Sequence, residues 1–141
     1  ELRLHSQDRI ALLTSYSHAI GILDILGSLL NGAALHLYDF KLDGSMPRFA
    51  HWLNQEQITL FHSVPSVFRF FMKNLDDAVQ LPHIRMVLLG GEVVSGTDFD
   101  LYRQKCADDC LFVNFLGCSE LMVISFSIMN KNMAVPQGKT P

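Results

Sequence analysis

Apolar runs typical of buried β-strands alternate along this chain with segments of helical spacing, and that alternation restricts the fold most. The clearest strands, residues 84–89 and 111–115, are continuous apolar runs of the kind buried on both faces of a parallel sheet. A helical pattern over 97–106 separates them, so one strand–helix unit takes about 25 residues. Parallel strands with right-handed crossovers follow from such units. We therefore predict an α/β fold, a mostly parallel sheet with flanking helices.

Similar patterns predict the remaining elements. Strands are expected at 9–15, 33–38, 58–64 and 125–129, helices at 20–30, 45–55 and 66–79, and a short helix or turn at 119–124. Asn31-Gly32 is a typical helix stop, and Ser45 and Ser66 are typical N-caps. One apolar face of the 66–79 helix is predicted to pack in the core. It comprises Val67, Phe70, Phe71 and Leu75.

Composition and charge restrict the class of protein. With 49% hydrophobic and 18% charged residues, the 141-residue chain can form a folded core. A net charge of −3 without a basic run argues against nucleic acid as a partner. The longest apolar stretch, 19–30, is interrupted by Asp24 and is too short to span a membrane. No secretion signal is visible and Cys106, Cys110 and Cys118 lack zinc spacing, so we expect a cytoplasmic protein with reduced, mostly buried thiols.

Small polar clusters follow two neighbouring predicted strands. Gly90, Gly91 and Glu92 follow the first, and the run from Asn114 to Glu120 follows the second. Because ligands of open α/β sheets bind at the carboxyl ends of the strands, the two clusters predict one shared site. The glycines allow a flat ligand to approach the backbone, but they also fit an ordinary tight turn, and Glu92 also fits a solvated loop. Both interpretations stay open from these residues alone.

The second cluster contains residue types that nucleotide chemistry uses. The amide of Asn114 has both a donor and an acceptor for the edge of a base. Ser119, near a helix start, suits a phosphate oxygen, and Glu120 suits Mg²⁺, which takes one or two carboxylates together with phosphate oxygens. Ser119 and Glu120 fit a simple helix cap equally well, so their spacing does not decide between the two.

Two histidines lie near the ends of predicted elements. His62 is close to the end of its strand and can face a pocket, and His18 precedes an apolar helix. Neither has an obvious Asp or Ser partner in the sequence, and a lone histidine is more often structural. The G-x-S-x-G elbow and the glycine–lysine loop of Walker type are both absent. If a nucleotide binds, these residues supply only part of its site.

Several motifs in a fixed order resemble one known family. They are Asp8-Arg9-Ile10-Ala11-Leu12, Asp24-Ile25-Leu26-Gly27-Ser28-Leu29-Leu30-Asn31-Gly32-Ala33, Ile58-Thr59 with Ser63-Val64-Pro65-Ser66, Leu89-Gly90-Gly91-Glu92, Asn114-Phe115-Leu116-Gly117-Cys118-Ser119-Glu120 and Val135-Pro136-Gln137-Gly138-Lys139. Together they make the chain similar to the adenylate-forming superfamily, which includes acyl-CoA synthetases, luciferases and, closest in likeness, nonribosomal peptide synthetase adenylation domains. The resemblance implies a single α/β segment over residues 1–141, part of the large N-terminal subdomain of such an enzyme.

The resemblance also implies an activity. In this family a carboxylic acid attacks the α-phosphate of ATP, giving an acyl-adenylate and pyrophosphate, and the acyl group passes to a thiol. It implies ATP and Mg²⁺ as cofactors, a carboxylic acid substrate, and a carrier protein's phosphopantetheine or coenzyme A as acceptor. The family's Ser/Thr/Gly-rich phosphate loop and catalytic lysine are not found in the chain. We therefore expect an internal fragment that is inactive without the rest of the parent adenylation domain.

Site residues carry over position by position. Ser119 matches a threonine that contacts phosphate and Glu120 matches the Mg²⁺-binding glutamate, so these two are the predicted catalytic residues. The predicted nucleotide-binding residues are Gly90, Gly91, Glu92, Asn114, Phe115, Leu116 and Gly117. The predicted acid pocket comprises Ala19, Ile20, Leu23, His62, Leu88, Gly90, Phe115, Val123 and Ile124.

Some positions depart from the family's pattern. Leu116 stands where an adenine-stacking tyrosine is usual, and Cys118 replaces a proline. Amino-acid-activating members pair the substrate ammonium with an aspartate, and Ala19 stands at that position. Because a buried ammonium without a counter-charge is costly, we expect an acid without an α-amino group. The alternatives are a degenerate, non-catalytic adenylation-like module and an unrelated flavodoxin-like domain.

Overall fold

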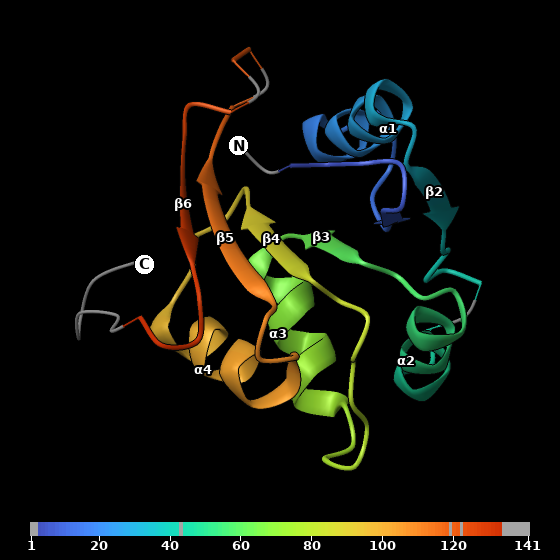
Figure 1. Ribbon diagram of the computed structural model, residues 1–141, viewed down its shortest axis with the longest axis vertical. Coiled ribbons are helices and arrows are strands. Elements are labelled where there is room, and N and C mark those ends of the chain that lie inside the picture. The colour runs from blue at the N-terminus through green and yellow to red at the C-terminus, as the bar shows by residue number, and fades with distance from the viewer. Residues whose placement is uncertain (1–2, 43, 119, 122, 134–141) are drawn as a thin grey trace.

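A sheet with the strand order β2-β1-β3-β4-β5-β6 forms the centre of the structure, a computed structural model that describes residues 3–42, 44–118, 120–121 and 123–133 (Figure 1). The strands are β1 (Arg9–Leu12), β2 (Ala34–Leu37), β3 (Leu60–Ser63), β4 (Met86–Gly90), β5 (Leu111–Leu116) and β6 (Ser125–Met129). The helices are α1 (Ala19–Asn31), α2 (Met46–Gln55), α3 (Pro65–Asn74) and α4 (Gly96–Lys105). All described strand pairs are parallel except β5 with β6. The predicted α/β fold with a mostly parallel sheet is confirmed.

The two faces of the sheet are covered differently. Helices α2, α3 and α4 pack on one face and bury the larger apolar core, while α1 lies across the opposite face (Figure 1). A smaller core runs over that second face, and its buried members are Ile10, Leu60, Met86, Leu88 and Val113. These residues share a face because strand side chains alternate between the two sides of a sheet. Between α1 and this second face lies the space in which the candidate site forms.

Most predicted elements match the structure to within a few residues. Helix α1 ends at Asn31, and Gly32 follows it in the left-handed conformation with φ 67°, so the predicted stop is confirmed. Ser45 is the N-cap residue of α2, as predicted. The first strand ends at Leu12 rather than at residue 15, because pairing with β2 extends only to Leu37. Helix α4 begins at Gly96, where a capping box between Ser95 and Asp98 satisfies its first turn.

The prediction for α3 is wrong in its bounds and in half of its core face. The helix begins at Pro65 and ends at Asn74, and its N-cap is Val64 rather than Ser66. Proline is favoured at the first helical position, where it has no amide hydrogen to leave unsatisfied. The predicted core residues Val67 and Phe70 are 37% and 60% exposed. Phe71 and Leu75 are buried as predicted, and Phe68 and Met72 complete the buried face.

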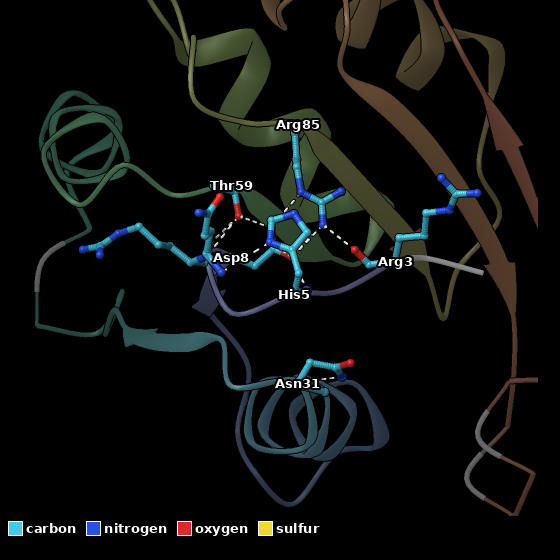
Figure 2. Close-up of polar contacts among 9 residues, drawn as sticks. Arg3, His5, Asp8, Asn31, Thr59 and Arg85 are labelled. Atoms are coloured by element: carbon cyan, nitrogen blue, oxygen red, sulfur yellow. Dashed lines mark hydrogen bonds and ion pairs between the residues drawn. The ribbon is translucent and has the colours of Figure 1, made fainter.

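A hydrogen-bonded junction joins the amino ends of three strands (Figure 2). Arg85, just before β4, donates from Nε to Asp8 Oδ1 at 2.7 Å and from Nη2 to Asp8 Oδ2 at 2.6 Å. The hydroxyl of Thr59, just before β3, and the backbone N–H of His5 each donate to the same carboxylate at 2.9 Å. Burial raises the pKa of Asp8, but these hydrogen bonds outweigh it and hold the pKa below its ordinary value. Asp8 therefore links β1 to β3 and β4 at the edge opposite the strand carboxyl ends.

The three cysteines are free thiols. Cys106 and Cys110 are buried, as expected, whereas Cys118 is exposed. The Tyr102 hydroxyl donates to the carbonyl of Cys110, and burial raises the pKa of that tyrosine. Among the described residues, no helix combines the length and the apolar character that crossing a membrane requires.

Candidate functional site

The carboxyl ends of four parallel strands meet the start of α1 around one cavity of about 420 Å³. Thr14, Val64, Gly91 and Gly117 come from the segments that follow β1, β3, β4 and β5. The other lining residues are His18, Ala19, Ile20, Leu23, Phe115 and Cys118. We call this space the smaller cavity. It lies where open α/β sheets bind their ligands, and the two glycine-containing clusters of the sequence contribute to it as predicted.

The start of α1 sets the charge at the smaller cavity. His18 is the N-cap residue and Ala19 the first helical residue, and no acidic residue lies in the first turn. A helix N-terminus attracts negative charge. The Oγ1 of Thr14 is buried and has no hydrogen-bond partner among the described residues, so it is a further polar atom at this cavity. The arrangement suits a carboxylate or phosphate oxygen better than an ammonium.

A second cavity of about 430 Å³, the larger cavity, lies between α1 and the second face of the sheet. Its lining residues are Leu4, Ile10, Leu23, Asp24, Leu26, Gly27, Leu30, Leu60, His62, Leu88, Val113, Phe115, Val123 and Phe126. Apart from Asp24 and His62, these residues are apolar. Leu23 and Phe115 line both cavities, so the two spaces adjoin at these side chains.

Phe115 is positioned by a glycine of the neighbouring strand. Gly90 of β4 pairs with Phe115 of β5, and a Cβ built on Gly90 would lie 2.4 Å from the ring atom Cζ of Phe115. The ring therefore occupies the space that any other residue at position 90 would fill. The ring of His62 packs edge-on against the same phenylalanine, with 5.2 Å between centroids. Gly90 therefore shapes the site indirectly, because its missing side chain leaves room for the Phe115 ring.

His62 does have an acidic partner, contrary to the sequence-based prediction. Its Nδ1 lies 2.6 Å from Oδ1 of Asp24, which is 38 positions earlier in the chain. His62 is 3% exposed and Asp24 6% exposed. Burial raises the pKa of Asp24 above its ordinary value, although the neighbouring His62 acts in the opposite direction. The sequence did contain one signal of this pair. Asp24 lies within an apolar helical stretch, and a carboxylate buried there needs a polar partner.

The predicted nucleotide-binding residues divide between the two faces of the sheet. Phe115 faces the cavities, and by strand alternation Asn114 and Leu116 point to the opposite face. Leu116 is 64% exposed. Gly91 adopts a φ of 79°, which favours glycine, so the turn after β4 depends on it.

Glu92 interacts with the start of a helix. Its two carboxylate oxygens accept hydrogen bonds from the backbone N–H and the hydroxyl of Ser66, at 2.9 and 2.8 Å. Ser66 lies in the first turn of α3, where negative charge is stabilising. The glutamate therefore caps α3.

Glu120 lies in a turn and its side chain is exposed. A hydrogen bond from its own backbone, followed by one from Cys118, lowers the pKa of its carboxyl below the ordinary value, so it is ionised at neutral pH. The described residues contain no cluster of three or more His, Cys, Asp or Glu that could hold a metal ion. A single carboxylate fits Mg²⁺ only where phosphate oxygens and water complete the coordination. Ser119 lies outside the described residues.

Most of the predicted acid pocket comes together around the two cavities. The predicted residues that line a cavity are Ala19, Ile20, Leu23, His62, Leu88, Phe115 and Val123, with Gly91 and Gly117 from the nucleotide set. Gly90, Glu92, Asn114, Leu116, Glu120 and Ile124 line neither cavity. Sequence reasoning did not find Thr14 or the Asp24–His62 pair.

Comparison with known proteins identifies the family. The model of the AMP-binding enzyme family matches residues 1–140. This chain belongs to the AMP-binding enzymes. It is similar to bacitracin synthase 3 of Bacillus licheniformis, with 26% identity over 125 residues, which are 87% of this chain and 2% of that protein. The predicted superfamily is confirmed.

Solved structures agree on the fold. The N-terminal subdomain of Klebsiella oxytoca NpsA, described in complex with anthranilyl-AMSN, superposes with a TM-score of 0.79 at 21% identity, over 95% of this chain and 34% of that one. The nonribosomal peptide synthetase FmoA3 gives a TM-score of 0.81 at 18% identity, over 98% of this chain and 15% of that one. The chain thus has the fold of part of the N-terminal subdomain of such enzymes and spans only a small part of the length of the relatives that it matches.

Proposed function

We propose that this chain forms the acid-binding core of an ATP-dependent ligase that converts a carboxylic acid to an acyl-adenylate for transfer to a thiol. The smaller cavity supports this proposal most directly, because four strand ends and the start of α1 converge around it. The chain belongs to the AMP-binding family. The acid carboxylate lies there, beside the N-terminus of α1, and the body of the acid passes Leu23 and Phe115 into the larger cavity. Carrier-protein phosphopantetheine or coenzyme A is the acceptor thiol.

The nucleotide approaches the smaller cavity from the glycine-containing turns. Gly91 and Gly117 line that cavity without side chains that would keep a phosphate or sugar away. Glu120 would hold Mg²⁺ together with phosphate oxygens, and the chemistry that a bound ion would supply there is neutralisation of phosphate charge. By family resemblance Ser119, Asn114 and Leu116 would contact the nucleotide, Asn114 and Leu116 from the face of β5 opposite the two cavities.

We further propose that the acid lacks an α-amino group. Ala19 lies at the smaller cavity with no acidic residue in the first turn of α1, so an ammonium there has no counter-charge. The nearby carboxylate of Asp24 does not supply one, because it lines the larger cavity and is paired with His62. An α-keto, α-hydroxy, aryl or unsubstituted aliphatic acid avoids this cost.

The test is acid-dependent ATP–pyrophosphate exchange by the full-length protein that contains this chain. Matched acids with α-amino, α-hydroxy, α-keto and unsubstituted carbons are compared. We expect exchange with the last three only, and none from the isolated 141-residue chain, whose sequence lacks the family's phosphate loop and catalytic lysine. Preferential exchange with α-amino acids would refute the interpretation of Ala19 but would still support the assignment as a ligase. No exchange with any acid would favour a degenerate, non-catalytic module.

A further inference from the structure

The larger cavity combines an apolar lining with one buried polar pair. Asp24 comes from α1 and His62 from β3, and among the described residues that line this cavity no other side chain is ionisable. Both residues are more than nine-tenths buried, so water does not solvate them freely. The hydrogen bond between His62 Nδ1 and Asp24 Oδ1 uses one polar atom of each residue.

The other polar atom of each residue is unsatisfied. In the part of the chain that the structure describes, Asp24 Oδ2 and His62 Nε2 are buried and have no hydrogen-bond partner. Buried polar atoms in folded proteins nearly always have one, so two such atoms on residues that line one cavity point to a ligand. A role in folding alone accounts for the bond between the pair and leaves these two atoms unexplained.

The chemistry of the pair selects the ligand group. The free carboxylate oxygen accepts hydrogen bonds, while the free imidazole nitrogen accepts or donates according to its proton. A hydroxyl matches every one of these states, because it both donates and accepts. An amine matches the states in which Oδ2 or Nε2 accepts. A methyl group or a hydrogen matches none, and leaves both atoms buried and unpaired.

We propose that Asp24 and His62 recognise a hydroxyl or amino group at the end of the substrate acid remote from its carboxylate. The inference rests on the proposed function, since it uses the same pair of cavities. The carboxylate lies in the smaller cavity, the apolar body passes Leu23 and Phe115, and the polar end meets the pair. The substrate class is therefore an ω-hydroxy or ω-amino acid, or a ring-substituted aryl acid, with an apolar body.

The test compares matched acids on the full-length protein. Benzoate, phenylacetate, 3-phenylpropanoate and hexanoate are each paired with a hydroxyl and an amino counterpart at the distal carbon, and the aryl acids also with a para-methyl counterpart of similar size. Binding is measured by calorimetry, and pyrophosphate exchange is measured separately. We expect a hydroxylated or aminated member to bind roughly tenfold or more tightly than its unsubstituted and methyl counterparts.

Two variants separate recognition from folding. The double variant Asp24→Leu with His62→Phe replaces both polar partners by apolar groups, which is often nearly neutral for stability. It should abolish or invert the preference while the protein stays folded. Asp24→Asn keeps an acceptor and should reduce the preference in part. The exposed Asp100→Asn is the matched control and should change neither binding nor exchange.

The outcomes distinguish this inference from the proposed function. Exchange without preference for a polar end overturns the inference, and so does a preference that survives the double variant. Either result leaves the proposed ligase function standing. Preferential binding that depends on the pair, in a protein without exchange, supports the inference and overturns the proposed function. Neither exchange nor preferential binding across the panel overturns both.

Discussion

At the scale of single residues, a glycine and a phenylalanine on adjacent strands shape the candidate site. The Phe115 ring forms a wall shared by the two cavities, and it fits only because Gly90 has no side chain. The ring also supports His62, so the position of the buried pair depends on it. Sequence reasoning placed both residues in the pocket, and the structure adds that Gly90 packs against the Phe115 ring.

Gly90→Ala tests that packing. The added methyl would lie 2.4 Å from the Phe115 ring, so the ring must move, and such overpacking costs about 1–3 kcal/mol of unfolding free energy. We also expect a raised KM for the acid with a smaller change for ATP. The measurements are urea unfolding and steady-state exchange kinetics on the full-length protein.

Gly96→Ala is the matched control for this change. No atom lies within 4 Å of a Cβ built on Gly96, which is the first residue of α4. Alanine there should raise the free energy of unfolding by about 0.4–1 kcal/mol, because it restricts the unfolded chain, and it should leave KM unchanged. Equal effects of the two substitutions would contradict the packing account.

At the scale of elements, two carboxylates hold the scaffold of the site from opposite ends of the strands. Asp8 links the amino ends of β1, β3 and β4 (Figure 2), and Glu92 caps α3 from the turn after β4. Both residues belong to motifs that indicated the family. Their contacts show that part of such a motif maintains strand and helix placement, so a match in sequence does not by itself make a residue a ligand contact.

Asp8→Asn tests the junction and its dependence on pH. The Asp8 carboxylate is buried but its partner Arg85 is 28% exposed, so removing the charge should cost about 1–3 kcal/mol of unfolding free energy at pH 7. The folded-state pKa of Asp8 lies below its ordinary value of 3.8, so its contribution is complete above that value and is lost as pH falls through the folded pKa. The difference between wild type and variant should therefore shrink in acid.

Urea unfolding of the full-length protein from pH 7 to pH 3 measures that difference. Asp100→Asn, on the exposed side of α4, serves as the control and should change stability by less than about 0.5 kcal/mol at every pH. A difference between wild type and Asp8→Asn that stays constant or grows in acid would exclude the assigned ionisation of Asp8.

At the scale of the whole molecule, periodicity predicts the elements better than it predicts their contacts. The runs at 84–89 and 111–115 were found because buried parallel strands are apolar throughout, and Gly32 marked a helix end. The antiparallel β6 at the sheet edge does not follow from strand–helix alternation. The Asp24–His62 pair could not be read from spacing, because only the approach of α1 to β3 joins residues so far apart.

The transfer of oxygen from acid to AMP would show whether the full-length protein forms an acyl-adenylate. The full-length protein is given ATP, a thiol acceptor and an acid whose carboxylate carries oxygen-18, and the products are analysed by mass spectrometry. If the carboxylate attacks the α-phosphate at the smaller cavity, the AMP released on thiol transfer contains one labelled oxygen and the pyrophosphate contains none. Label in inorganic phosphate, or AMP without label despite turnover, would contradict the assignment as an acid-adenylating ligase.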